Sequence, residues 1–163
     1  MGDEDVYKEF VSTLIPLSET VRWKIHNVSE LVKHSAFSAI SIPFEVGVGP
    51  TGLSKWEISL VSHVASGMLQ ARARLTGLVG HAQSSVTHHV TIWLRRNGSL
   101  SQVRYEKDFL RCKETSLPGE PTIWEVIPLE DLQDEASGIL DVDADCFDLV
   151  VKLTVFGQDV SQV

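Results

Sequence analysis

Two arginines on one short segment are the side chains best suited to binding a charged ligand. Arg72 and Arg74 alternate with apolar residues in segment 69–75, and Gln70 shares their side. Successive side chains of a strand point to opposite faces, so these three polar side chains are predicted to face the same way. Guanidinium groups form charge-assisted hydrogen bonds with carboxylates and phosphates. Together with His89, the pair therefore predicts a site for an acidic or phosphorylated peptide.

Aromatic and imidazole side chains mark a second candidate surface. His89, Thr91 and Trp93 share one side of an alternating segment, and tryptophan is enriched in contact surfaces. One hypothesis places Trp93 in a binding surface, and the alternative is that this side packs beneath a loop. Tyr105 and Trp124 are open to the same two interpretations. The candidate peptide-binding residues are therefore Arg72, Arg74, His89, Trp93, Tyr105 and Trp124.

An acidic turn, Asp141-Val142-Asp143-Ala144-Asp145, begins like a calcium-binding loop. An EF-hand loop needs glycine at its sixth position and a bidentate glutamate at its twelfth. Cys146 and Lys152 occupy those positions, so the turn is predicted to be a solvated connection into the last strand. The alternative is a β-sandwich hydrolase or carbohydrate-binding protein that uses the carboxylates of the loop 141–148.

Signatures of other chemistries do not occur in the sequence. His88 and His89 are adjacent, so on a strand they would point to opposite faces and could not chelate one ion. There is no Gly-x-Ser-x-Gly elbow and no glycine-rich phosphate loop. The carboxylate pairs 130–131 and 134–135 follow Pro128 on a short helical pattern, where they favour the helix dipole. We expect a binding protein without catalytic residues, metal ion or cofactor.

Charge and composition narrow the class of partner. The 163 residues carry a formal net charge of −8 and the isoelectric point is near 5.1, which argues against nucleic acid, because phosphates need a basic surface. No apolar run reaches the roughly 18 residues of a membrane span. The start, Met1 to Asp5, is acidic, unlike a signal peptide. Cys112 and Cys146 are too few for a disulfide framework, so we expect reduced thiols in the cytoplasm or nucleus.

Alternation of apolar and polar residues dominates the chain from Thr20 onward and predicts antiparallel strands with one buried face. Asn97-Gly98 predicts a tight hairpin turn. Many short strands with regular turns indicate an all-β sandwich, here over residues 18–157, with a C-terminal tail at 158–163. The expected strands are Val21–Ile25, Phe37–Val48, Trp56–Leu60, Leu69–Leu75, Val86–Arg96, Leu100–Lys107, Thr122–Ile127 and Phe147–Val155.

The first residues, 1–17, are expected to differ from the rest. Val6, Phe10, Leu14 and Leu17 recur at helical spacing, and Pro16 would end the helix. The segment is predicted to be a lead-in that is either a short amphipathic helix or partly disordered. A further alternative for the whole chain is a self-assembling structural domain that docks through this helix, so an oligomer through the N-terminal segment is one expectation.

Three segments together resemble a meprin and TRAF homology (MATH) domain, also called a TRAF-C-like domain. Trp23-Lys24-Ile25-His26-Asn27-Val28-Ser29 is similar to the opening strand of the family, and Lys55-Trp56-Glu57-Ile58 to its tryptophan-bearing strand. Leu129–Leu140 is similar to its short helix and to the small-residue turn before its last strand. The resemblance extends roughly from Thr20 to Phe156. It implies an eight-stranded antiparallel β-sandwich with one short helix before the last strand.

Members of this family bind short extended peptides in a shallow groove across one sheet. The resemblance therefore implies a protein-interaction module rather than an enzyme, with substrate recruitment in ubiquitin-ligase or TRAF-type signalling assemblies. Two groove aromatics of the family fall at or near Arg72 and His89, and its Trp-Gly before the helix falls near Pro121-Thr122. The expected ligand is therefore an acidic or phosphorylated peptide rather than a Ser/Thr-rich one.

Overall fold

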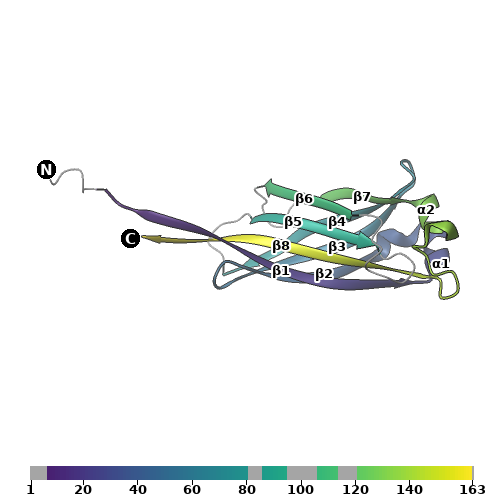
Figure 1. The fold of residues 1–163 in the computed structure, drawn as a ribbon, viewed down its shortest axis with the longest axis horizontal. Coiled ribbons are helices and arrows are strands. Elements are labelled where there is room, and N and C mark those ends of the chain that lie inside the picture. The colour runs from purple at the N-terminus through teal and green to yellow at the C-terminus, as the bar shows by residue number, and fades with distance from the viewer. Residues whose placement is uncertain (1–6, 81–85, 95–105, 114–120, 163) are drawn as a thin grey trace.

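The computed structural model describes residues 7–80, 86–94, 106–113 and 121–162. Within these residues the chain forms two antiparallel sheets of four strands each, ordered β1-β8-β5-β6 and β2-β3-β4-β7 (Figure 1). The strands are β1 (Phe10–His26), β2 (Ile40–Val48), β3 (Gly52–His63), β4 (Met68–Val79), β5 (Val86–Leu94), β6 (Glu106–Lys113), β7 (Thr122–Pro128) and β8 (Cys146–Gln162).

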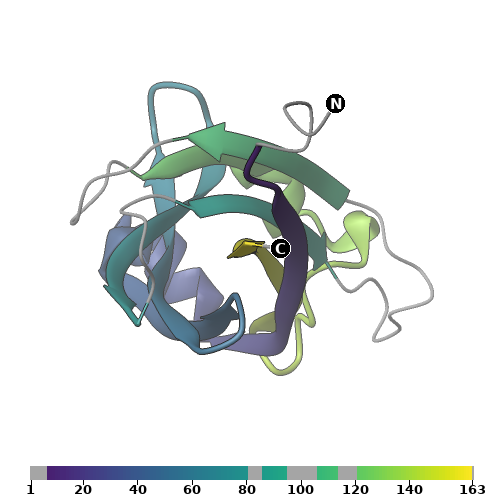
Figure 2. The same cartoon turned by 90° about the vertical axis from the view of Figure 1, so that its left-hand side faces the viewer.

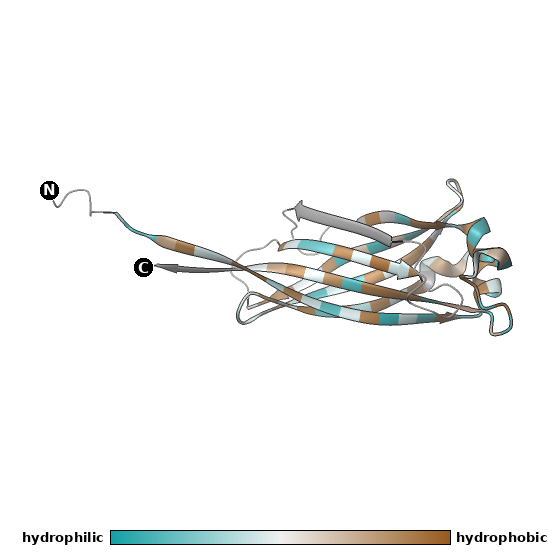
Figure 3. Ribbon diagram, viewed as in Figure 1, coloured by the Kyte–Doolittle hydropathy of each residue, from teal (hydrophilic) through white to brown (hydrophobic). Residues whose placement is uncertain are grey.

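The two sheets curve about a common apolar interior, so the architecture is all-β and sandwich-like (Figure 2). Alternate side chains fill this interior. On β8, for example, Phe147, Leu149, Val151 and Leu153 are at most 2% exposed. The same alternation is visible as changing hydropathy along the strands (Figure 3). A period of two is what a sheet with one buried face requires, and the predicted all-β fold is confirmed.

Short helices lie together at one end of the sandwich (Figure 1). Leu132 is completely buried and anchors the short helix predicted before the last strand. No helix in the described part of the chain is long and apolar enough to cross a membrane. The helices are α1 (Val28–Lys33) and the 3-10 turn η2 (Ala36–Ala39) after β1, and α2 (Leu129–Gln133) and the 3-10 turn η4 (Glu135–Ser137) before β8.

The prediction of a helical lead-in is wrong from Phe10 onward, because this segment is the first part of β1. β1 pairs with β8 along its full length of 17 residues. Branched residues such as Val11 and Ile15 favour extended backbone. The long hydrogen-bonded ladder with β8 therefore outweighs the helical spacing of a few apolar side chains. The part of the prediction that concerns residues 1–6 lies outside the described residues.

Several strand ends also differ from the prediction. The expected C-terminal tail belongs to β8, which continues to Gln162, and β2 begins only at Ile40 because η2 occupies the residues before it. The turn Asn97-Gly98 lies outside the described residues. A two-residue turn at Asn97-Gly98 would place residue 102 opposite Trp93. Trp93 instead pairs with Glu106, which lies four residues further along the chain. β5 and β6 are therefore antiparallel neighbours, as predicted, but in a different register.

β1 and β8 continue beyond the sandwich as a two-stranded ribbon (Figure 1). The pairing of β5 with β8 ends at Phe156. One residue further, the backbone of β8 crosses the turn after β2 so closely that a Cβ on Gly157 would overlap the backbone nitrogen of Gly49. Only glycine allows this approach, so the crossing fixes where the ribbon leaves the body. The β-arm is defined as Phe10–Leu14 together with its partners Gln158–Gln162.

Candidate functional site

Arg72 and Arg74 lie on β4, on the outer face of the sheet β2-β3-β4-β7. The alternate residues Ala71, Ala73 and Leu75 are 0, 1 and 2% exposed and form part of the core. Because side chains alternate along a strand, burial of these three turns both arginines outward. The two guanidinium groups therefore share one face, as the sequence pattern predicts.

The two arginines differ in their surroundings. Arg74 donates a hydrogen bond of 3.2 Å to the carboxylate of Glu57 on β3. Arg72 lies opposite Ser59 on β3 and Ile123 on β7 and is partly buried. Its Nε has no hydrogen-bond acceptor among the described residues. Among the described residues, Arg74 is thus held by a carboxylate and Arg72 forms no ion pair.

The neighbours of Arg72 on β7 were not identified from the sequence. Ile123 is 48% exposed, so an apolar side chain stands at the surface in the same row as the guanidinium. Among the described strands β7 pairs with β4 alone, which leaves its other edge free. The alternation of segment 122–127 signals a strand, but it does not tell which strand lies beside it.

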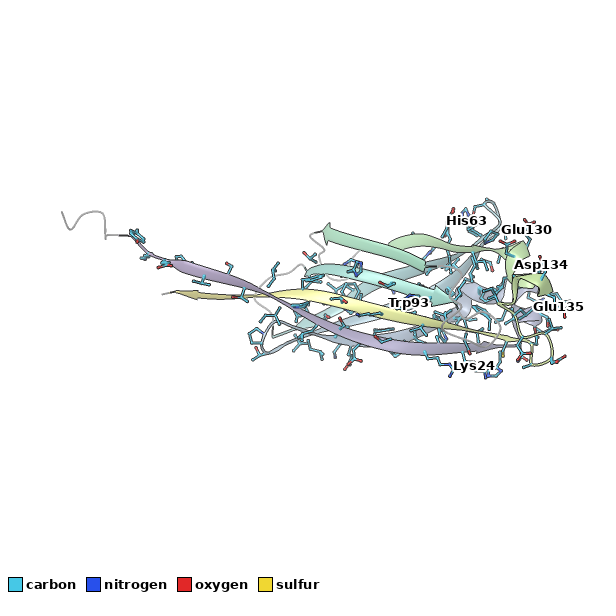
Figure 4. All side chains as sticks on the ribbon, in the orientation of Figure 1. Lys24, His63, Trp93, Glu130, Asp134 and Glu135 are labelled. Atoms are coloured by element: carbon cyan, nitrogen blue, oxygen red, sulfur yellow. The ribbon has the colours of Figure 1, made fainter. Side chains whose placement is uncertain are left out.

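His89 and Trp93 lie on β5, in the other sheet (Trp93 is labelled in Figure 4). Both are partly buried on its outer face, because Val90 and Ile92 between them point into the core at 0 and 2% exposure. The outer faces of the two sheets point away from each other. One extended peptide therefore cannot contact Arg72 and His89 across a single face, and the candidate residues divide into two sets.

The remaining candidates are placed only in part. Tyr105 lies outside the described residues. Trp124 belongs to β7 and pairs with β4 through its backbone. The first of the adjacent histidines, His88, is 4% exposed and packs in the core with its ring centroid 4.9 Å from that of Trp56. The two adjacent histidines thus point to opposite faces, as the strand pattern predicts.

The acidic turn folds around its own carboxylates and the start of α1. Asp145 accepts hydrogen bonds from the backbone N–H and the hydroxyl of Ser29, at 3.0 and 2.6 Å. Asp141 accepts a hydrogen bond of 3.2 Å from the backbone N–H of Ala144. These carboxylates act within the fold, where they tie the turn to itself and to the helix.

A shallow depression of about 590 Å³ lies beside this turn. On its wall Asp148 forms an ion pair of 2.8 Å with Arg22. Acidic side chains of α2 and of the residues after it gather at the same end of the molecule, where Figure 4 labels Glu130, Asp134 and Glu135. The described residues hold no group of three or more His, Cys, Asp or Glu side chains placed to bind a metal ion. The lining residues are Arg22, Lys24, Glu135, Gly138, Ile139, Leu140, Asp141, Val142, Asp143, Cys146, Phe147 and Asp148.

Comparison with known proteins gives no family for the chain. No protein-family model matches the sequence, and no curated protein matches it significantly. The resemblance described above therefore stands on the segments around Trp23 and Trp56 and on Leu129–Leu140. A function for the chain has to be inferred from the chemistry of its own faces.

Proposed function

We propose that the chain is a peptide-binding module of the MATH type. In this proposal an extended acidic or phosphorylated segment of a partner protein lies on the face that carries Arg72 and Arg74. The observation that carries the proposal is the guanidinium of Arg72, which lies partly exposed on this face and has no ion-pair partner among the described residues, whereas Arg74 has one. A carboxylate or phosphate oxygen that contacts the exposed part of this guanidinium would form a charge-assisted hydrogen bond.

Two features of the fold support a module of this type. Two antiparallel sheets of four strands each form the arrangement that an eight-stranded sandwich requires. The short helix α2 and the turn η4 stand before the last strand, where the resemblance expects a helix and a small-residue turn. Recruitment of substrates to ubiquitin ligases, or TRAF-type signalling in the cytoplasm or nucleus, belongs to the same proposal because it comes with the family.

The surroundings of Arg72 suggest how a peptide would lie. Glu57 already pairs with Arg74, so Arg72 would be the anchor for an acidic or phosphorylated side chain. Ile123 would supply an apolar contact beside it. The edge of β7 that pairs with no described strand would offer main-chain groups to an added strand, a recurring mode of peptide recognition. The net charge of −8 opposes an acidic ligand only weakly at this point, since exposed charges beyond about 8 Å are screened at physiological salt.

A peptide array tests the proposal. The array carries extended peptides in acidic, phosphoserine and neutral versions, and the protein is applied as wild type and as three variants. Arg72→Glu is expected to lower binding of acidic and phosphorylated peptides about tenfold or more, because a repulsive charge replaces the anchor. Arg72→Lys is expected to fall between, since lysine keeps the charge but loses the planar fork.

Lys24→Glu is the matched control. Lys24 is exposed on β1, in the opposite sheet, and its replacement changes the net charge by the same amount. Binding should survive this substitution. Equal weakening by Lys24→Glu and Arg72→Glu would mean that overall charge, and not a site, governs binding. Failure of every version of the peptides to bind the wild type would reject the proposal.

A further inference from the structure

Two charges of opposite sign lie beside the strand β7. Arg72 on β4 is opposite Ile123 on β7, and Gln70 is opposite Glu125. Glu125 is exposed and shares the outer face with Arg72, because the β7 residue before it pairs with the buried Ala71. Neither Arg72 nor Glu125 forms an ion pair with a described residue. The two groups are diagonal neighbours on adjacent strands, yet neither neutralises the other.

The charges beside β7 follow an order along the strand. Arg72 and Arg74 on β4 lie next to the N-terminal end of β7. Glu125 lies further along, and Glu130 follows in the first turn of α2, where it is exposed. Figure 4 labels Glu130 at the helical end of the molecule. The surface beside β7 is therefore positive near the start of the strand and negative near its end.

The outer edge of β7 has a defined length. This edge pairs with no described strand. Pro121 precedes β7 and Pro128 is its last residue, and proline has no N–H to donate to a sheet ladder. The segment 122–127 between them contains no proline. A strand added to this edge therefore spans about six residues, which include the positions opposite Ile123 and Glu125.

We propose that this face binds an extended segment whose basic residue stands two positions before its acidic or phosphorylated residue. This inference rests on the proposed function and adds the charge order, the spacing and the direction of the ligand. The segment lies antiparallel to β7, with its basic side chain opposite Glu125. Its acidic side chain lies opposite Ile123 and reaches across to Arg72. The two backbones are about 10 Å apart there, two strand spacings, which the arginine and the ligand side chain bridge together.

The direction follows from the order of the charges on the protein. In an antiparallel pair the position opposite Glu125 comes first in the ligand, and the position opposite Ile123 comes two residues later. Side chains two apart on a strand share a face, so both lie on the side of Arg72. The ligand residues before the basic one run toward Glu130. A parallel segment with the same charges would set its acidic residue against Glu125, where like charges repel.

Glu125 selects the ligand by repulsion as well as by attraction. A charge on an edge strand discourages pairing with other chains. The carboxylate of Glu125 opposes an acidic side chain at the facing position and favours a basic one. Specific recognition commonly combines the two effects. The basic residue of the ligand also offsets the net charge of −8, which works against a purely acidic segment.

Fluorescence anisotropy with the full 163-residue chain tests the charge order. The probes are labelled peptides of valine and threonine that carry lysine-x-phosphoserine, alanine-x-phosphoserine, the reversed phosphoserine-x-lysine, or lysine-x-x-phosphoserine. The first is expected to bind about two- to fivefold more tightly than the second, as an opposite-charge cross-strand pair provides. The reversed peptide should gain nothing, because its charges meet like charges. The fourth should gain nothing either, because the extra residue turns its lysine to the other face.

Variants of Glu125 test whether this residue sets the preference. Glu125→Lys should bind the lysine-x-phosphoserine peptide more weakly than the alanine peptide, and a glutamate-x-phosphoserine peptide should recover the affinity. Glu125→Gln should remove the preference without reversing it. Glu19→Lys is the matched control, because Glu19 is exposed on β1 in the opposite sheet and the net charge changes by the same amount. This control should keep the wild-type order of the peptides.

The outcomes separate this inference from the proposed function. If no peptide binds, or if Arg72→Glu leaves the binding unchanged, the proposed function fails and the charge order fails with it. If the peptides bind through Arg72 but all four bind equally, the charge order alone is overturned. It is also overturned if Glu125→Lys and Glu19→Lys change the affinities alike, because overall charge would then explain the preference.

Discussion

The carboxylate of Asp145 accepts a hydrogen bond of 2.6 Å from the hydroxyl of Ser29, which lies 116 residues earlier in the chain. It also accepts the backbone N–H of Ser29 at 3.0 Å. Asn27, at the start of α1, has a left-handed φ of 57° and makes no side-chain cap. A distant residue therefore caps the helix, and the acidic turn that resembles half of a calcium loop is a tie between α1 and β8.

Two substitutions of Asp145 should separate the contribution of its hydrogen bonds to stability from the cost of its left-handed backbone conformation. Its φ is 51°, so Asp145→Ala keeps a Cβ at this left-handed position, removes the carboxylate and is expected to cost about 1 kcal/mol of unfolding free energy. Asp145→Gly removes the carboxylate and also relieves the left-handed strain, so it should be roughly 1 kcal/mol more stable than the alanine variant. Urea unfolding measures both. An alanine variant as stable as wild type would mean that the bonds to Ser29 contribute nothing.

The crossing of β8 over the β2–β3 turn predicts that position 157 accepts only glycine. A methyl group on Gly157 would overlap the backbone of Gly49, so Gly157→Ala is expected to cost about 1–3 kcal/mol through overpacking. Gly77→Ala is the matched control, since a Cβ there meets Lys55 at an ordinary 3.6 Å. Thermal unfolding should show a clear loss for the first variant and little change for the second. Equal melting temperatures would contradict the close crossing.

Local sequence patterns predicted most strands of this chain correctly. The features that they did not predict depend on contacts between segments far apart in the sequence. The alternation around Trp56, Ile58 and Leu60 depends on residues two apart, so it can be read from a short window. The strand conformation of Phe10 depends on Gln162, and no local window contains both. The same limit explains why the helical spacing at the N-terminus was misleading.

In the candidate site, too, relationships within one strand could be predicted from the sequence and relationships between strands could not. Arg72 and Arg74 were correctly expected on one face, because they share a strand. His89 could not be assigned to a face relative to them, because that depends on which sheet β5 joins. β5 lies between β8 and β6, in the sheet opposite β4. The order of strands is set by long-range pairing, and alternation carries no information about it.

A buried chain of hydrogen bonds at β3 gives a third prediction. The indole N–H of Trp56 donates to the hydroxyl of Ser54 at 2.8 Å, and that hydroxyl donates to the carbonyl of Val46 at 2.7 Å. Ser54 is completely buried, so Ser54→Ala leaves the indole donor unpaired and should cost about 1–3 kcal/mol. Ser41→Ala, on an exposed position of β2, should change stability by less than about 0.5 kcal/mol.

Calorimetric or urea unfolding would measure the two serine variants side by side. Fluorescence of the buried indole offers a second readout, because loss of the hydroxyl changes the polarity around Trp56. A Ser54→Ala protein with wild-type stability would show that the indole finds another acceptor. In that case the neighbouring ring of His88, 4.9 Å away between centroids, would be the first place to look.

Two ion pairs of unequal burial allow a final comparison. Arg22 and Asp148 are 55 and 13% exposed and lie 2.8 Å apart, whereas Arg74 and Glu57 are 44 and 43% exposed and lie 3.2 Å apart. Because water screens exposed pairs, a double-mutant cycle should give a coupling of about 0.5–1 kcal/mol for the first pair and about 0.2–0.5 kcal/mol for the second. Both values should fall in high salt.

The order of the two couplings carries more information than their size. A larger coupling for Arg22 with Asp148 would show that this pair helps to hold β1 against β8 near the acidic turn. A larger coupling for Arg74 with Glu57 would contradict that ranking. It would also show that Arg74 is firmly held on its face, so that a ligand of that face would have to be recognised through Arg72 alone.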